Sequence, residues 1–418
     1  TSNVFRGSGV IAATAGGLSW DTAVVTGSTV TVSAGNGYFI NTTSNTCTIT
    51  LPSSAEVGDQ IVFIDYLRTW GTNKIIIDSN GLNYQGEDDT YTVEYNTDGE
   101  TVNIVYADAT KGWIPLNDDD VTEAPVAPPT QKAIMGYGTT AVAAVSLTNL
   151  VNSSGVVATD TTGVGTARSQ LAAATYGGDK AIFGYGAGGP VTAITNLVNN
   201  SGVVATDTSG VGTARNVLAA AAYGLDKAIF GYGYSGGYLS MTNLVSNSGV
   251  VSADVSGVGT ARQNLAATGY GSTGQALFGY GDSAPVGYVS LTNLVSNVGV
   301  VATDTSGVGT ARIFPGAATY GGDKAIFAYG ATPTNVNMSN LVSNTGVVSA
   351  DVTGVGTARA SMGAAGYGGD KAIFAYGMPG SPTAISNLVS SSGVVASDVS
   401  GVGTARQLLA AAGYSYSA

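Results

Sequence analysis

One seven-residue phrase, KAIFGYG with close variants, occurs six times in the C-terminal two-thirds of the chain. The copies begin at Lys132, Lys180, Lys227, Gln275, Lys324 and Lys371. The steps between copies are 48, 47, 48, 49 and 47 residues, and 48 residues run from Lys371 to the end. A period of about 20–50 residues is typical of solenoids, propellers and arrays. Six equivalent repeats therefore fill residues 132–418 and constrain how this part of the chain can fold.

Each repeat contains four short segments that alternate apolar and small residues. They read KAIFGYG, TNLVSNSG, VVATDTSG and, after the crossover VGTAR, LAAAxYG. Gly, Asn and Asp turns separate them, which is typical of strands, and all four are too short for the paired helices of a helical solenoid. Four strands in each repeat predict one blade of a β-propeller.

The two ends of the repeat region complement each other. The first repeat starts at the second strand, and the last ends with an unpartnered first strand, Leu408–Ala418. If this strand pairs with Lys132–Gly138, the ring closes and no sheet edge is left open. The sequence therefore predicts an all-β protein in which residues 132–418 form a six-bladed β-propeller closed by the C-terminal strand.

The repeat resembles the kelch blade, which has an Arg, a small-apolar strand, a Tyr-Gly turn and a strand that ends in glycines. The resemblance covers all six repeats. The chain departs from the kelch pattern because GYG or AYG replaces the double glycine and the usual Trp is absent. The resemblance implies the blade architecture and carries no kelch partner with it.

An Arg and an Asp recur once in each repeat, with the Asp eight residues before the Arg. The arginines are Arg168, Arg215, Arg262, Arg312, Arg359 and Arg406. The aspartates are Asp160, Asp207, Asp254, Asp304, Asp351 and Asp398. The six arginines are either a ring of cations that binds an anionic glycan, or one half of Arg–Asp contacts that tie the blades together. Equal numbers of the two charges favour the second interpretation.

The stretch after each GYG or AYG differs from repeat to repeat, and we expect these loops to form one rim. The residues that interrupt the pattern there are Tyr234, Tyr238, Asp282, Tyr288, Asn335 and Asn337. Tyr rings pack on sugar faces, and Asn and Asp form hydrogen bonds with hydroxyl groups. The rim is therefore the candidate ligand-binding site, and loop drift after duplication is the alternative.

The composition excludes several chemistries. The chain has no His and one Cys, Cys47, which rules out Ser-His-Asp and Cys-His catalysis, His-bound metals and an internal disulfide. Asp282 is the only acid of the repeats outside the recurring positions, whereas a glycosidase needs two facing carboxyl groups. We expect no catalytic residue, no metal and no cofactor, and we interpret Cys47 as a small buried residue.

Charge is concentrated at the front of the chain. Residues 1–131 hold four basic and sixteen acidic residues, and residues 132–418 hold eleven of each. A neutral repeat region lacks the basic surface that nucleic acids require. No apolar stretch is long enough to cross a membrane, so we expect neither nucleic acid nor membrane insertion.

Residues 19–116 contain seven alternating runs between turns, which predict a β-sandwich. Trp20, Trp70 and Trp113, the only tryptophans, are expected to be core or interface anchors. Residues 1–18 form an expected N-terminal arm. Residues 117–131, NDDDVTEAPVAPPTQ, form an acidic, Pro-rich linker.

The motifs GYFINTT, LP…GD…DY and YADATKGW, within residues 20–113, resemble a domain of tail-fibre-like virion proteins from marine and cyanobacterial tailed bacteriophages. The resemblance implies a virion, extracellular location, other virion proteins as partners, and a homo-oligomer such as a trimer. The leading hypothesis is a non-enzymatic appendage whose propeller binds a host surface glycan or receptor. The alternative is a capsid-decoration or filament protein that makes only protein–protein contacts.

Overall fold

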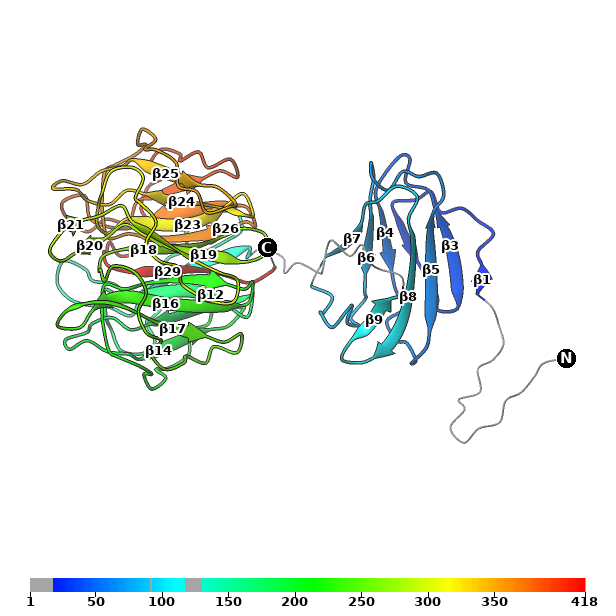
Figure 1. The fold of residues 1–418 in the computed structure, drawn as a ribbon, viewed down its shortest axis with the longest axis horizontal. Coiled ribbons are helices and arrows are strands. Elements are labelled where there is room, and N and C mark those ends of the chain that lie inside the picture. Colours follow the sequence, from blue (N-terminus) through cyan, green and yellow to red (C-terminus); the bar gives the residue numbers. More distant parts are fainter. Residues whose placement is uncertain (1–17, 91, 117–129, 418) are drawn as a thin grey trace. The chain divides into compact units, whose positions relative to one another are not determined.

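The computed structural model describes residues 18–90, 92–116 and 130–417, and the chain divides into two compact domains (Figure 1). We call Thr1–Pro128 the front domain and Pro129–Ala418 the repeat domain. Every regular element in the described ranges is a strand, so the expected all-β fold is confirmed. The expected arm at residues 1–18 and the linker at 117–131 lie almost entirely outside the described residues.

The front domain contains two sheets. The first has the order β1 (Ser19–Trp20), β3 (Asn36–Ile40), β5 (Gln60–Asp65), β8 (Thr101–Asp108) and β9 (Gly112–Pro115). The second has the order β2 (Thr29–Thr31), β4 (Cys47–Thr50), β6 (Ile75–Asp78) and β7 (Val93–Tyr95). Strands β1 to β6 alternate between the sheets, so neighbours among them pair in parallel, whereas β7, β8 and β9 pair antiparallel.

The core of the front domain follows from the alternation of its strands. Cys47 and Ile49 of β4 point inward and are fully buried together with Trp70 and Trp113. Burial raises the pKa of the Cys47 thiol to about 11, in keeping with a small core residue. Trp20 differs from the other tryptophans, because it is 42% exposed and stacks on the ring of Phe39.

The repeat domain consists of six three-stranded antiparallel sheets, each built from the same three segments. The first strands are β12 (Ala172–Tyr176), β15 (Ala219–Tyr223), β18 (Ala266–Tyr270), β23 (Gly316–Tyr320), β26 (Gly363–Tyr367) and β29 (Ala410–Tyr414). The second strands are β10 (Lys132–Gly136), β13 (Lys180–Gly184), β16 (Lys227–Tyr234), β19 (Gln275–Gly279), β24 (Lys324–Ala328) and β27 (Lys371–Ala375). The third strands are β11 (Thr148–Val151), β14 (Thr195–Val198), β17 (Tyr238–Val245), β22 (Thr292–Val295), β25 (Ser339–Val342) and β28 (Ser386–Val389). A further short pair, β20 (Asp282–Ser283) and β21 (Gly287–Tyr288), lies in one loop.

The C-terminal strand completes the first sheet, as the sequence predicts. Strand β29 pairs antiparallel with β10, from Lys132 opposite Tyr414 to Gly136 opposite Ala410. Each first strand also packs beside the first strands of two other sheets, in the order β29, β12, β15, β18, β23, β26 and back to β29. Figure 1 shows β29, in red, beside the green strand β12. The six sheets therefore follow one another in a closed cycle.

The expected fourth strand is reduced to two isolated bridges in each sheet. In the sheet of β14, Val204 bridges to Val198 and Thr208 bridges to Thr195. Asp207 lies between the two bridging residues, and its carboxylate accepts hydrogen bonds from Thr166 of the crossover. Residues 204–208 therefore contact both the crossover, through Asp207, and the strand β14. Because these contacts alternate along the segment, it does not form a continuous ladder.

Candidate functional site

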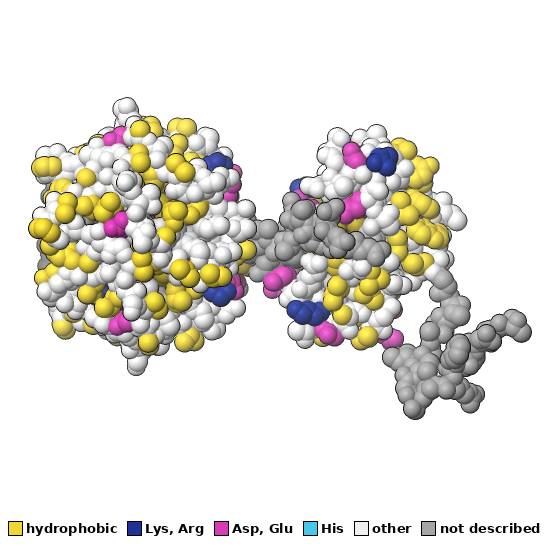
Figure 2. Space-filling model, viewed as in Figure 1, with side chains coloured by type: hydrophobic (Ala, Val, Ile, Leu, Met, Phe, Trp, Pro, Cys, Tyr) yellow, Lys and Arg dark blue, Asp and Glu magenta, His cyan; other side chains and the backbone are white. Residues whose placement is uncertain are grey.

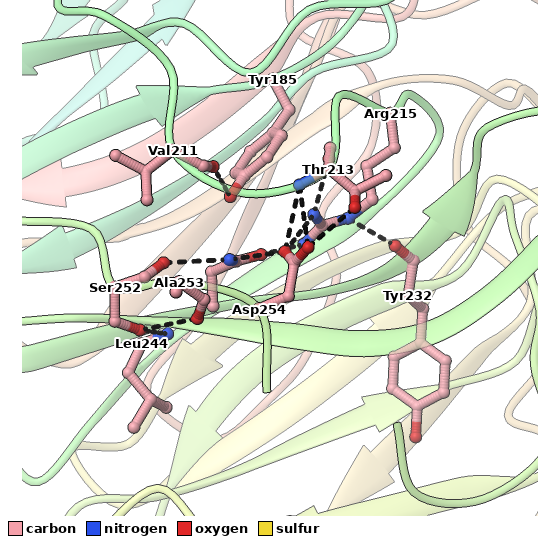
Figure 3. A network of polar contacts seen from close by, with 10 residues as sticks. Tyr185, Val211, Thr213, Arg215, Tyr232, Leu244, Ser252, Ala253 and Asp254 are labelled. Carbon is pink, nitrogen blue, oxygen red and sulfur yellow. Dashed lines mark hydrogen bonds and ion pairs between the residues drawn. The ribbon is translucent and has the colours of Figure 1, made fainter. Parts of the chain in front are cut away.

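A buried Arg lies at the centre of each repeated polar network, shown for Arg215 in Figure 3. Arg215 is fully buried, and its guanidinium carbon lies 4.3 Å from the centre of the Tyr185 ring. Its Nε donates to the Tyr232 carbonyl at 2.9 Å, and a terminal nitrogen donates to Oδ1 of Asn243 at 2.7 Å. Buried charge is costly unless hydrogen bonds satisfy it, and these partners meet that need.

The Asp of the network fixes the crossover that enters the sheet. Asp254 accepts hydrogen bonds from Nδ2 of Asn243 at 2.9 Å and from the Thr213 hydroxyl at 2.7 Å. Burial by itself raises the pKa of Asp254, but the hydrogen bonds from Asn243 and Thr213 outweigh it, and the net pKa lies below the ordinary value. The carboxylate form therefore stabilises the folded domain.

The Arg–Tyr packing recurs in all six repeats, and each of the two Arg hydrogen bonds described for Arg215 recurs in four of them. Every Arg lies 4.1–4.5 Å from the Tyr ring of the preceding sheet. The acid that approaches an Arg belongs to the next repeat and not to the position eight residues earlier. Ion pairs of 3.8–4.0 Å join Arg215 to Asp254, Arg262 to Asp304, Arg359 to Asp398 and Arg406 to Asp160. Because all six arginines are fully buried, they expose no surface to an anionic glycan, which favours the tying role.

Four of the six candidate rim residues come together. The rings of Tyr234 and Tyr238 meet edge to face with centres 5.9 Å apart, and the Tyr238 hydroxyl donates to Oδ2 of Asp282 at 3.0 Å. This hydrogen bond raises the pKa of Tyr238. Asp282 pairs across β20 and β21 with Tyr288. We call Tyr234, Tyr238, Asp282 and Tyr288 the rim cluster.

The other two candidates, Asn335 and Asn337, lie apart from the rim cluster and support the backbone. Nδ2 of Asn335 donates to the Met378 carbonyl at 2.8 Å, and Nδ2 of Asn337 donates to the Gly356 carbonyl at 2.7 Å. Both amides are thus engaged with neighbouring segments, which favours a scaffold role for them.

A ring of backbone hydrogen bonds joins one residue from each repeat, and the sequence reasoning missed it. The amide of each residue donates to the carbonyl of its equivalent in the preceding repeat, at 2.8–3.3 Å, and Gln170 donates to Leu408 to close the circle. We call these residues the backbone ring: Gln170, Val217, Asn264, Phe314, Ser361 and Leu408.

Every member of the backbone ring has a positive φ, from 48° to 59°. This conformation is costly for residues other than Gly, above all for β-branched Val217. The chain uses Gly at most of its other described positive-φ positions, yet none of these six is Gly. The three residues after the recurring Arg vary from repeat to repeat (SQL, NVL, QNL, IFP, ASM and QLL), and this variability is visible in the sequence. The positive φ is not visible there, because it arises from contacts among six distant segments.

A cavity of about 80 Å³ lies against the backbone ring. The residues that follow the ring in each repeat also line this cavity and are all buried; we call them the apolar floor: Leu171, Leu218, Leu265, Pro315, Met362 and Leu409. One side of the ring is polar, because Nδ2 of Asn264 donates to Oδ1 of Asp282 at 2.8 Å and Nδ2 of Asn216 donates to Gln170 at 2.7 Å. Asp282 therefore connects the rim cluster to the backbone ring.

No family model matches the chain, and no curated protein matches it. Within residues 18–90, 92–116 and 130–417, no three His, Cys, Asp or Glu side chains are grouped so that they could hold a metal ion. The same ranges contain no helix with the length and apolar character needed to cross a membrane.

Proposed function

We propose that the chain is a tail-fibre-like virion appendage of a tailed bacteriophage and that its repeat domain is a six-bladed, kelch-like β-propeller. In this proposal the front domain is a β-sandwich and acts as the structural module. The propeller binds a host surface glycan or receptor and catalyses no reaction. The protein is extracellular on the virion. Other virion proteins, and further copies of this chain such as a trimer, are the remaining partners. The closed cycle of first strands and the pairing of β29 with β10 support the architecture.

The rim cluster is the observation that carries the binding role. Its residues interrupt an otherwise copied pattern, and the fold brings them to one place from two repeats. Tyr234 and Tyr288 are 36% and 42% exposed, so aromatic surface is available to a ligand. The described partners of Asp282 are a hydroxyl and amides, which suits hydrogen bonding to a sugar.

The charge of the repeat domain favours a neutral ligand. The repeats hold equal numbers of acidic and basic residues. Figure 2 shows mostly apolar and uncharged side chains on the visible face of this domain. Loops on a rigid scaffold commonly carry recognition, and the Tyr and Asp residues of the rim cluster are a suitable set for a neutral glycan.

A second candidate function rests on a different set of residues. One Val in each repeat is 60–66% exposed: Val156, Val203, Val250, Val300, Val347 and Val394. Apolar side chains repeated on the surface favour protein–protein contacts. This observation supports the alternative of a capsid-decoration or filament protein.

Adsorption competition tests the proposed function. The purified full chain is added to susceptible bacteria before the phage, and free phage are counted. We expect the chain to slow adsorption in a saturable manner, and gold-labelled antibodies against it to mark the tail of the particle. Unchanged adsorption together with labelling over the capsid would overturn the proposal in favour of the decoration protein.

A further inference from the structure

We infer that the backbone ring and the apolar floor form a subsite for a methyl-bearing substituent of a neutral sugar, such as the methyl of a 6-deoxy sugar or of an N-acetyl group. The inference rests on the proposed function, because it takes the ligand to be a surface glycan. It goes further by naming the part of that glycan that is recognised and the residues that recognise it.

The residues of the backbone ring share one strained backbone conformation but vary in their side chains. The Tyr residues of the GYG and AYG turns also have positive φ, but each is constant and packs under an Arg. The side chains of the backbone ring share no such partner, and their identities range from Ser to Phe. The hydrogen bonds of the ring use backbone atoms alone, so these side chains are free to vary and to line a ligand subsite.

The cavity has the size of a small substituent. The cavity of about 80 Å³ exceeds the roughly 10–15 Å³ that one water molecule requires. It is much smaller than the 300–1,000 Å³ or so of a pocket that encloses a whole drug-sized ligand. The cavity therefore suits a substituent of a few heavy atoms and leaves the pyranose ring itself at the rim.

The lining of the cavity is amphipathic. The apolar floor offers a methyl group van der Waals contact with six apolar side chains. On the polar side, the side chains of Gln170 and Asn264 line the cavity, and the carboxylate of Asp282 lies next to Asn264. A hydroxyl or amide N–H beside the methyl group can form hydrogen bonds with these polar side chains.

The direct test is saturation-transfer NMR on the full chain with free monosaccharides at millimolar concentration. The probes are L-rhamnose and L-fucose for the 6-deoxy methyl, N-acetylglucosamine for the acetyl methyl, and glucose and galactose as methyl-free controls. We expect at least one methyl-bearing sugar to bind five-fold or more tightly than the controls, with the largest transfer at its methyl protons. Equal binding of all five sugars, or no binding, would overturn the inference.

Ser361 offers a variant pair that separates the subsite from the scaffold. Ser361→Leu introduces a residue that Leu408 already places at the equivalent position with the same backbone conformation. We expect it to unfold like the parent chain and to weaken binding of the methyl-bearing sugar ten-fold or more by filling the cavity. Ser361→Gly, the matched control, retains binding. Undiminished sugar binding by a folded Ser361→Leu chain contradicts the inference.

The two proposals fail in distinguishable ways. If Ser361→Leu and the parent chain block phage adsorption equally well, the subsite is wrong and the proposed function stands. If the parent chain binds methyl-bearing sugars but does not block adsorption, the subsite stands and the appendage role is wrong.

Discussion

At the scale of single residues, every repeat buries one Arg and surrounds its guanidinium with similar partners. Arg215 has no exposed surface, and burial lowers the pKa of its guanidinium. The aromatic face of Tyr185, two backbone carbonyls and the Asn243 amide oxygen compensate for the lost water. Asn243 in turn donates to Asp254. Removing one member leaves a buried polar group unpaired, which explains why all members recur together.

The six network aspartates predict a loss of stability in acid. Each has a pKa below its ordinary value, so the carboxylate contributes stability that is present above the unfolded pKa of about 3.9. That contribution is lost as the pH falls through the folded pKa. Urea unfolding at pH 5, 4 and 3 should show a falling free energy of unfolding. Asp254→Asn should reduce the change in the free energy of unfolding between pH 5 and pH 3. If this change is the same in the variant as in the parent chain, Asp254 does not contribute to the loss of stability in acid.

The backbone ring predicts a substitution that stabilises the protein. Ser361 has φ of 59°, a conformation that Gly adopts without steric cost. Ser361→Gly should raise the free energy of unfolding by about 0.5–1 kcal/mol, the strain of an L-residue less the extra chain entropy of Gly. Thermal unfolding measures the change. A clear decrease in stability would show that the Ser side chain supports the fold and that backbone strain at this position is not the dominant effect.

At the scale of strands, each sheet of the repeat domain places one Ala and one Gly opposite each other on its first and second strands. Four sheets place an Ala on the first strand opposite a Gly on the second, as in Ala172 opposite Gly184. Two sheets reverse the order, with Gly316 opposite Ala328 and Gly363 opposite Ala375. A side chain from the next sheet packs on each pair: Phe374 lies against Gly316, and flexible Met135 lies against Gly363. Each pair therefore has room for one methyl group.

This pairing predicts coupled effects of substitution. A Cβ on Gly316 would lie 2.7 Å from the Phe374 ring, so Gly316→Ala should cost about 1–3 kcal/mol by overpacking. Adding Ala328→Gly restores the arrangement of the other sheets and should recover most of that loss. A double-mutant cycle in urea measures the coupling. Additive effects of the two changes would contradict a shared volume.

The sequence was informative wherever a property is local or periodic. It predicted the all-β class, the pairing of β29 with β10 and the burial of Cys47. It did not predict the parallel pairing of β1, β3 and β5 in the front domain, because alternation of apolar residues is the same in both strand directions. It missed the backbone ring because six residues acquire their conformation only when six distant segments meet.

At the scale of the whole molecule, the first sheet differs from the other five. Elsewhere a tight turn joins the first and second strands, but β29 and β10 are separated by most of the repeat domain. Arg406 reaches Asn149, and Thr404 reaches Asp160, across this junction. Closing a long loop costs more chain entropy than closing a short one. The contacts of Arg406 and Thr404 therefore offset the entropy cost of joining the two ends of the repeat domain, which is the largest loop-closure cost among its sheets.

Closure predicts unequal effects of one substitution at equivalent sites. Asp160→Asn should lower the free energy of unfolding by about 1–3 kcal/mol, and more than the matched Asp254→Asn, because it weakens the junction that has no turn. Deleting Leu408–Ala418 should destabilise the whole repeat domain cooperatively. Calorimetry of the three chains checks the order. Equal effects of the two substitutions, together with an unchanged transition after the deletion, contradict the closure.

In the proposed function, the copied residues hold the scaffold and the uncopied residues bind the host surface. The most direct test is the binding isotherm of the labelled full chain on isolated host envelope, measured beside thermal unfolding. We predict that Tyr238→Ala with Tyr288→Ala abolishes saturable binding and leaves the unfolding temperature within a few degrees of the parent. The matched change of two exposed residues, Val250→Ser with Val300→Ser, should leave both unchanged. Full binding by the Tyr variant, or loss of binding in the Val variant, would show that recognition lies outside the rim cluster.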